Sequence, residues 1–153
     1  MMSLLQKVQT AARHNTTYQV GLLQTKAYRV LKQHTARVLS EFDISTIEWA
    51  FLGLLNDNPK GLRLNVLATE LGVEAPFITQ MSIRLKKTGY FEHREDPEDS
   101  RAKIIMMTKE GKEFVASAEK HLRAETKALF LGVSTSDLLT YISVLDTIIH
   151  NMK

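Results

Sequence analysis

One continuous stretch, residues 62–111, constrains the fold of this chain more than any other part. It opens with LRLNVLATELG, whose apolar residues have helical spacing and whose final glycine stands where a helix commonly ends. The short connection Val73-Glu74 then forces the next helix to cross the first. Pro76 suits the first turn of that second helix, which we expect from about Ala75 to Thr88. The stretch therefore predicts a helix-turn-helix.

Two strand-like runs follow the second helix. YFEHR and AKIIMMT are rich in aromatic, β-branched or long apolar residues, as strands are. The segment between them, EDPEDS, combines aspartate, proline and serine, which favour a turn. We therefore predict a β-hairpin wing with Arg94, Arg101 and Lys103 along its arms. Thr108 is expected to cap the helix that comes next through its hydroxyl group.

This joined run of helices and hairpin resembles the MarR family of winged-helix transcriptional regulators. The likeness extends from LATELGVEAPFITQMSIRLKKTG through EHREDPEDSRAKIIMMT to KEG. It is strongest in the wing, where Asp99, Arg101 and Ile105 fit the family's D-x-R-x-x-x-(L/I) pattern. The resemblance implies a mainly α fold with a small β-hairpin wing (α+β), a winged helix-turn-helix with N- and C-terminal dimerisation helices.

The remaining composition fits one domain built around this section. A chain of 153 residues with 44% hydrophobic and 24% charged residues is typical of a soluble globular domain. We expect a single domain over residues 1–153, with dimerisation helices at 16–42 and 109–153 and the DNA-binding section at 43–108. No apolar run reaches the length of a bilayer, and the N-terminus lacks the apolar segment of a signal peptide. The expected location is the cytoplasm, with no membrane partner.

The terminal segments carry more apolar surface than one winged core can cover. An amphipathic helix is expected from Thr16 or Thr17 to Leu39, and another from 109 to about 131. The last helix opens at Ser134 and carries the apolar stripe Leu138, Tyr141, Ile142, Leu145, Ile148 and Ile149. Pairing of these terminal helices in a homodimer would cover the stripes, and twofold symmetry is the commonest closed arrangement.

The second helix of the helix-turn-helix has the size to enter the major groove of DNA. By resemblance, its reading positions are Ala75, Pro76, Phe77, Thr79, Gln80 and Arg84. Gln80 could pair with adenine and Arg84 could reach guanine or a phosphate, while Phe77 or Thr79 could touch a thymine methyl group. The alternatives are that Phe77 packs against the preceding helix and that the polar residues form an ordinary solvated face.

In the wing, Arg101 is the residue that we most expect to contact DNA. Its guanidinium could enter the minor groove, held in place by Asp99, or the two side chains could pair only to stiffen the hairpin. Arg94 and Lys103 are expected at phosphates, which position the protein without specifying a sequence. Arg63, ahead of the first helix, occupies the place where the family often has a hydroxyl cap, and we also expect it to contact the DNA backbone.

Other chemistry is poorly supported by the sequence. The chain has no cysteine, which excludes disulfides, thiolate metal sites and cysteine-based redox sensing. Its five histidines lack metal-ligand spacing, so we expect no metal and no cofactor. There is no phosphate-binding glycine loop, nucleophile elbow or paired-carboxylate pattern, so we expect no catalytic residues and no enzyme activity.

A small-molecule effector is implied by the resemblance. Ser45 and Glu48 predict a capping box at the start of an apolar helix that carries Trp49, near the expected junction of the dimerisation and DNA-binding sections. Arg29, His34 and Trp49 are therefore candidates for a site that binds a small aromatic or anionic ligand. Packing of Trp49 into the core is the competing interpretation.

The leading hypothesis is a homodimeric regulator, with repression as the expected outcome, that binds a pseudo-palindromic operator in double-stranded DNA. Its rival is a winged-helix protein-interaction module without DNA binding. Eight basic and seven acidic residues in 60–103 keep that rival open, because the section has almost no net charge.

Overall fold

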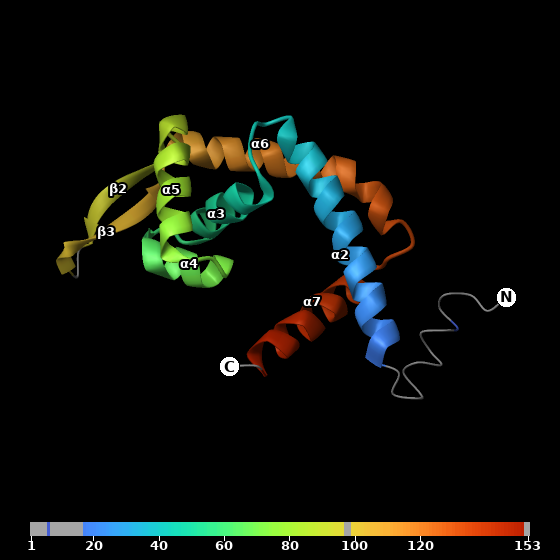
Figure 1. Ribbon diagram of the computed structural model, residues 1–153. Coiled ribbons are helices and arrows are strands. Elements are labelled where there is room, and N and C mark those ends of the chain that lie inside the picture. The colour runs from blue at the N-terminus through green and yellow to red at the C-terminus, as the bar shows by residue number, and fades with distance from the viewer. Residues whose placement is uncertain (1–5, 7–16, 97–98, 152–153) are drawn as a thin grey trace.

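The computed structural model describes Gln6, residues 17–96 and residues 99–151. The longer helices of this part are α2 (Thr17–Ser40), α3 (Thr46–Asp57), α4 (Leu64–Leu71), α5 (Ala75–Leu85), α6 (Lys109–Thr126) and α7 (Thr135–His150). The short 3-10 turns are η1 (Lys86–Thr88) and η2 (Lys127–Phe130), and the strands are β1 (Leu62–Arg63), β2 (Phe91–Asp96) and β3 (Asp99–Met107). Figure 1 shows α3, α4, α5 and the hairpin gathered in one section, with α2, the end of α6 and α7 on its other side.

The winged section, α3 to β3, is built around one hydrophobic core. The core takes its buried side chains from α3, α4, α5, the sheet and α6: Phe51, Leu52, Leu55, Leu67, Ala68, Ile78, Met81, Leu85, Phe91, Ile105 and Val115. Phe51 and Phe91 meet edge to face, with ring centroids 5.3 Å apart. Because four helices and a sheet contribute to the same cluster, the orientation of α5 is fixed by apolar packing along its inner face.

A three-stranded antiparallel sheet carries the wing, with β3 between β1 and β2. In β2 and β3, Phe91 lies opposite Met107 and His93 opposite Ile105, with a register irregularity between Glu95 and Asp96. The predicted hairpin is therefore confirmed. The strand β1 was not predicted, because its two residues lie inside the run assigned to the first helix and their pairing with Ile104 and Ile105 is distant in sequence.

The predicted helix starts are confirmed by capping contacts. The Ser45 side chain accepts from the Glu48 amide while Glu48 reaches back to the Ser45 amide, and a second capping box opens α7 at Ser134. Thr108 caps α6 by accepting from the amide of Gly111, with a separation of 3.1 Å. Two helix ends differ from expectation: α5 and α6 stop early and tighten into the turns η1 and η2, as terminal helical turns often do.

The terminal helices form a second, smaller core, which Trp49 and Phe114 join to the first. Val38, Leu39 and Ile44 pack with Leu122 of α6 in a small core at the end of α2. In contrast, α7 has no buried residue, and Figure 1 shows it folding back from the end of α6. Its exposed apolar side chains include Leu139, Tyr141, Ile142, Val144, Ile148 and Ile149. Of the predicted stripe, Tyr141, Ile142, Ile148 and Ile149 are exposed in the single chain, whereas Leu138 and Leu145 are partly buried.

Within the described ranges, no single helix is long and apolar enough to cross a membrane. Only the bent pair Lys109–Phe130 and Thr135–His150, at 100° to each other, meets that test when joined, by length and composition alone.

Candidate nucleic-acid interface

The outer face of α5 gathers the residues predicted to read DNA. Helical spacing turns Ile78, Met81 and Leu85 into the core, and Ser82 between them is also buried. The exposed residues of the helix are Ala75, Pro76, Phe77, Thr79, Gln80, Ile83 and Arg84. All six predicted reading positions therefore lie on the solvent side, together with Ile83, which sequence reasoning did not single out.

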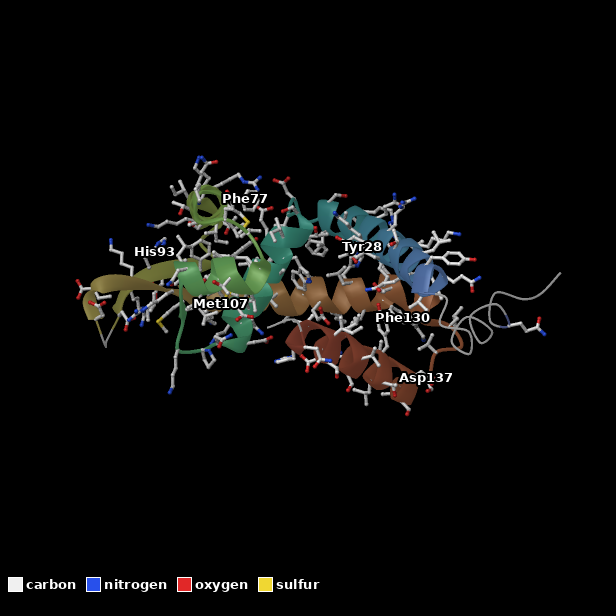
Figure 2. All side chains as sticks on the ribbon, turned by 60° about the horizontal axis from the view of Figure 1, so that its bottom comes forward. Tyr28, Phe77, His93, Met107, Phe130 and Asp137 are labelled. Atoms are coloured by element: carbon white, nitrogen blue, oxygen red, sulfur yellow. The ribbon has the colours of Figure 1, made fainter. Side chains whose placement is uncertain are left out.

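Apolar groups occupy much of this outer face. Phe77 is 48% exposed and Ile83 63% exposed, so Phe77 is not packed away as the alternative interpretation required. Figure 2 labels Phe77 at the surface of α5. The Thr79 hydroxyl donates to the carbonyl oxygen of Ala75 at 2.7 Å, so this donor is satisfied within the helix. Gln80 is exposed and carries an amide that could recognise a base edge.

Arg84 is engaged by a neighbouring helix. Its Nη2 atom lies 2.6 Å from Oε1 of Glu48, whose side chain is only 5% exposed, whereas the Arg84 side chain is 69% exposed. Sequence reasoning placed Glu48 only in the capping box and missed this second contact. The available signal was a carboxylate on a helix that is apolar on most sides, since buried charges are almost always paired.

The base of the wing is tied to the start of α4. Nε of Arg63 lies 2.6 Å from Oδ2 of Asp96, and the Asp96 side chain is 9% exposed. Arg63 thus anchors the wing, and its side chain is still 41% exposed. The contact spans the sheet from β1 to the end of β2 and holds the hairpin relative to the helix-turn-helix.

The other predicted wing residues differ in their surroundings. Arg94 forms an ion pair with Glu92 on the same strand. Lys103 is exposed and lies opposite Glu95 in the hairpin, and Asp99 is exposed near the tip. The side chain of Arg101 lies outside the described residues, so its orientation by Asp99 stays a prediction.

Further cations lie where α5 meets the wing. Partial burial, followed by the charges of Lys86 and Lys103, lowers the pKa of His93. These two lysines come from η1 and β3, and the charges of both act on the same imidazole. Lys87, next to Lys86, is also exposed. The lowered pKa favours the neutral form of His93, so the positive charge at this junction comes from Lys86, Lys87 and Lys103.

The candidate effector residues lie on α2 and α3. Arg29 is exposed, while His34 is partly buried and its Nε2 atom has no hydrogen-bond partner within the described part of the chain. Trp49 is partly buried and packs against both hydrophobic clusters, as the core interpretation predicts. Across the described residues, no group of three or more histidine, aspartate or glutamate side chains could hold a metal ion.

Comparison with characterised proteins found two transcriptional regulators. The chain is 22% identical over 121 residues to the HTH-type transcriptional repressor IacR of Pseudomonas putida, which covers 79% of this chain and 72% of that protein. It is 27% identical over 101 residues to the transcriptional regulator HosA of Escherichia coli O111:H-, with coverage of 63% and 74%. No protein-family model matches the sequence.

Solved structures share the fold over most of the chain. A MarR-family regulator from Rhodococcus sp. RHA1 superposes with a TM-score of 0.77 at 19% identity, covering 86% of this chain and 93% of that one. The repressor CouR bound to a 23-mer DNA duplex gives a TM-score of 0.72 at 25% identity, with coverage of 84% and 90%. CouR from Rhodococcus jostii RHA1 bound to p-coumaroyl-CoA gives 0.76 at 20% identity, with the same coverage of 84% and 90%.

These likenesses agree with the wing pattern, the helix-turn-helix and the terminal helices observed in this molecule. The chain has the winged helix-turn-helix fold of the MarR-family regulators, and the characterised proteins that it resembles are transcriptional regulators.

Proposed function

We propose that the chain is a cytoplasmic, sequence-specific DNA-binding repressor that binds a pseudo-palindromic operator as a homodimer. The observation that carries this proposal is the exposed outer face of α5, held by a packed inner face and flanked by the lysines of η1 and β3. A helix of this kind can enter the major groove while the wing lies along the backbone. The 25% identity to CouR, which is bound to DNA in its solved structure, supports the same function.

Homodimerisation gives the uncovered terminal faces a partner. Exposed apolar residues on α2, such as Tyr28 and Val30, and those along α7 form surfaces that a single chain leaves in water. In the proposed dimer, residues 16–42 and 109–153 form the dimerisation part and residues 43–108 the DNA-binding part. A twofold dimer would place two copies of α5 on half-sites about one helical turn of DNA apart, roughly 34 Å.

We further propose that a small aromatic or anionic molecule controls DNA binding. Arg29 could supply charge, and His34 an unsatisfied ring nitrogen, beside the aromatic surface of Trp49. Such a ligand would release DNA if it bound a dimer geometry in which the two α5 helices no longer match the half-sites. CouR supports this proposal because its solved structures include one bound to p-coumaroyl-CoA.

The test of DNA binding is a titration of the purified protein with its own upstream intergenic DNA and with a scrambled duplex, over a salt series. We expect the intergenic duplex to bind about 10³-fold more tightly or better. The logarithm of affinity should fall with the logarithm of salt by about 0.9 for each phosphate neutralised. Duplexes selected from a random pool extend the search if the operator lies elsewhere.

Two lysine variants show whether the salt slope comes from cations beside α5. Lys87→Ala removes a cation beside α5 and should reduce the salt slope by about 0.9 per subunit, because phosphate contacts set that slope. Lys120→Ala removes an exposed lysine on α6, two residues before Leu122 in the small core with α2, and should leave the slope unchanged. Failure of the wild-type protein to bind any duplex at low salt would favour the protein-interaction alternative.

Phe77 gives a specific prediction about the operator. Replacing thymine by uracil in a selected half-site removes only the methyl group that an apolar side chain can contact. We expect wild-type affinity to fall about fourfold for each methyl group buried by Phe77. Burial of one such group contributes about 0.8 kcal/mol to the binding free energy. The Phe77→Ala variant should bind thymine and uracil duplexes equally well.

Val66→Ala is the matched control for this experiment, because Val66 is also apolar and exposed but lies on α4. That variant should keep the full preference for thymine. A Phe77→Ala protein that still distinguishes thymine from uracil as strongly as the wild type would contradict the predicted contact.

A further inference from the structure

Glu48 makes two different kinds of contact with its two carboxylate oxygens. Oε2 accepts from the Ser45 amide at 2.8 Å and from the Ser45 hydroxyl at 2.6 Å, which completes the cap of α3. Oε1 lies 2.6 Å from Nη2 of Arg84 on α5. The cap occupies one oxygen, so the other is available to hold a cation from the reading helix.

The environment of Glu48 favours retention of this ion pair. Its side chain is 5% exposed, and a buried carboxylate is costly unless a cation and hydrogen bonds satisfy it. Removing the guanidinium would leave the buried charge with only the local cap. The Arg84 side chain is 69% exposed over its length, but its charged end is directed to α3.

The same ion pair links two parts of the chain that must keep a fixed geometry. Glu48 stands three residues after Ser45, directly beyond the segment that connects α2 to α3. Arg84 lies in the last turn of α5, two helical turns after Phe77. Through this contact, the N-terminal end of α3 adds a polar restraint on the C-terminal half of the reading helix, beside the apolar packing of Met81 and Leu85.

We propose that Glu48 is a positioning residue for DNA recognition: it keeps Arg84 at α3, which fixes α5 and withholds one cation from the phosphates. The inference rests on the proposed DNA-binding function. An arginine held in this way adds little sequence-independent affinity, because that affinity comes from cations that neutralise phosphates. Discrimination between sequences then depends more on Gln80, Phe77 and the other side chains of the outer face.

The experiment compares salt slopes and specificity ratios on a selected operator and a scrambled duplex. In Glu48→Gln, the neutral amide can still accept from the Ser45 amide, but it no longer holds Arg84 by charge. We expect tighter binding to the scrambled duplex, a slope steeper by about 0.9 per subunit, and a lower specificity ratio. The double variant Glu48→Gln with Arg84→Gln should return the slope to the wild-type value.

Two single variants separate positioning from capping. Ser45→Ala removes the capping hydroxyl but leaves the carboxylate and Arg84, so it should lower thermal stability without changing the salt slope. Arg84→Gln in the wild-type background should also leave the slope unchanged while lowering the specificity ratio. The measurement on Arg84→Gln tests the positioning role even if Glu48→Gln fails to fold.

The outcomes distinguish the inference from the proposed function. A slope that drops by about 0.9 per subunit in Arg84→Gln would show Arg84 already at a phosphate and would overturn the inference. An unchanged slope in a folded Glu48→Gln protein would also overturn the inference. The proposed function would still stand if the wild-type protein bound its operator specifically. Absence of wild-type binding to any duplex would overturn both.

Discussion

Ile142→Asp is expected to convert the proposed dimer into a monomer and to lower operator affinity by about a hundredfold or more, because bivalent binding is lost. Ile142 lies within the apolar stripe of α7 and is 53% exposed in the single chain. Pairing of this face would bury the new carboxylate without a cation, at a cost of several kcal/mol, and twofold symmetry introduces the change twice. Each 1.4 kcal/mol weakens association about tenfold.

Sedimentation over a range of protein concentrations measures the association, and titration of the operator measures DNA binding. The matched control is Ser143→Asp, which adds the same charge to the same helix one residue later. Ser143 is exposed on the side of α7 away from the stripe, so this variant should remain dimeric and bind DNA normally. An Ile142→Asp protein that sediments as a dimer would contradict the proposed interface.

This substitution tests association separately from folding. Because α7 has no buried residue in the single chain, the core of the winged section does not depend on it. We therefore expect the Ile142→Asp monomer to keep the helical content of the other elements, as measured by circular dichroism. Loss of that content would mean that the winged section requires the dimer in order to fold.

Local signals in the sequence predicted the fold well. Ser45, Thr108 and Ser134 each cap the helix that begins at the next residue, and Gly72 has the left-handed φ of 63° that lets it end α4. Each of these contacts joins residues only a few positions apart. Residue type and spacing are therefore enough to predict them.

Contacts between distant residues account for what the sequence did not predict. The strand β1 exists because Leu62 and Arg63 find partners in β3, more than forty positions along the chain. Arg63 was expected at DNA and is paired with Asp96, 33 positions away. For Glu48, the sequence shows a carboxylate on an apolar helix that needs a cation as partner. Only the packing of α3 against α5 determines that this cation is Arg84.

In the candidate site, too, the local features were predicted and the contact between distant residues was not. Helical periodicity correctly placed Phe77, Thr79 and Gln80 on the outer face of α5, since burial of one face determines the other. Periodicity could not reveal that Arg84, on this face, turns its charged end to Glu48. That contact is the basis of the proposal that Arg84 holds α5 in position, whereas the sequence predicted that it reads DNA.

Gly111→Ala is expected to destabilise the protein by about 3 kcal/mol or more, near the upper end of the range for overpacking. Gly111 is the third residue of α6 and is buried against the chain entering β2. A Cβ atom there would overlap the carbonyl oxygen of Tyr90 and the sulfur of Met107. The carbonyl belongs to the backbone and cannot rotate away, so the start of α6 would have to move.

Movement of α6 would break contacts that join it to the wing. The Thr108 amide donates to the Tyr90 carbonyl at 3.0 Å, and the Tyr90 ring stacks on Phe114 with centroids 4.2 Å apart. Helix propensity alone predicts the opposite sign, because alanine is favoured over glycine by about 1 kcal/mol inside a helix. The overlap with fixed backbone should outweigh that gain.

Gly53→Ala provides the comparison that isolates the overlap. Gly53 lies within α3, and a Cβ atom there would meet nothing within 4 Å, so only the propensity term should remain. Denaturant unfolding of both variants at one protein concentration should therefore give changes of opposite sign, with Gly53→Ala more stable than wild type by about 0.5–1 kcal/mol. Similar stability in the two variants would mean that α6 can shift at little cost and that Gly111 does not fix the wing. A large loss at Gly111 alone, accompanied by weaker operator binding, would show that the close approach of α6 to Tyr90 sets the position of the hairpin relative to α5.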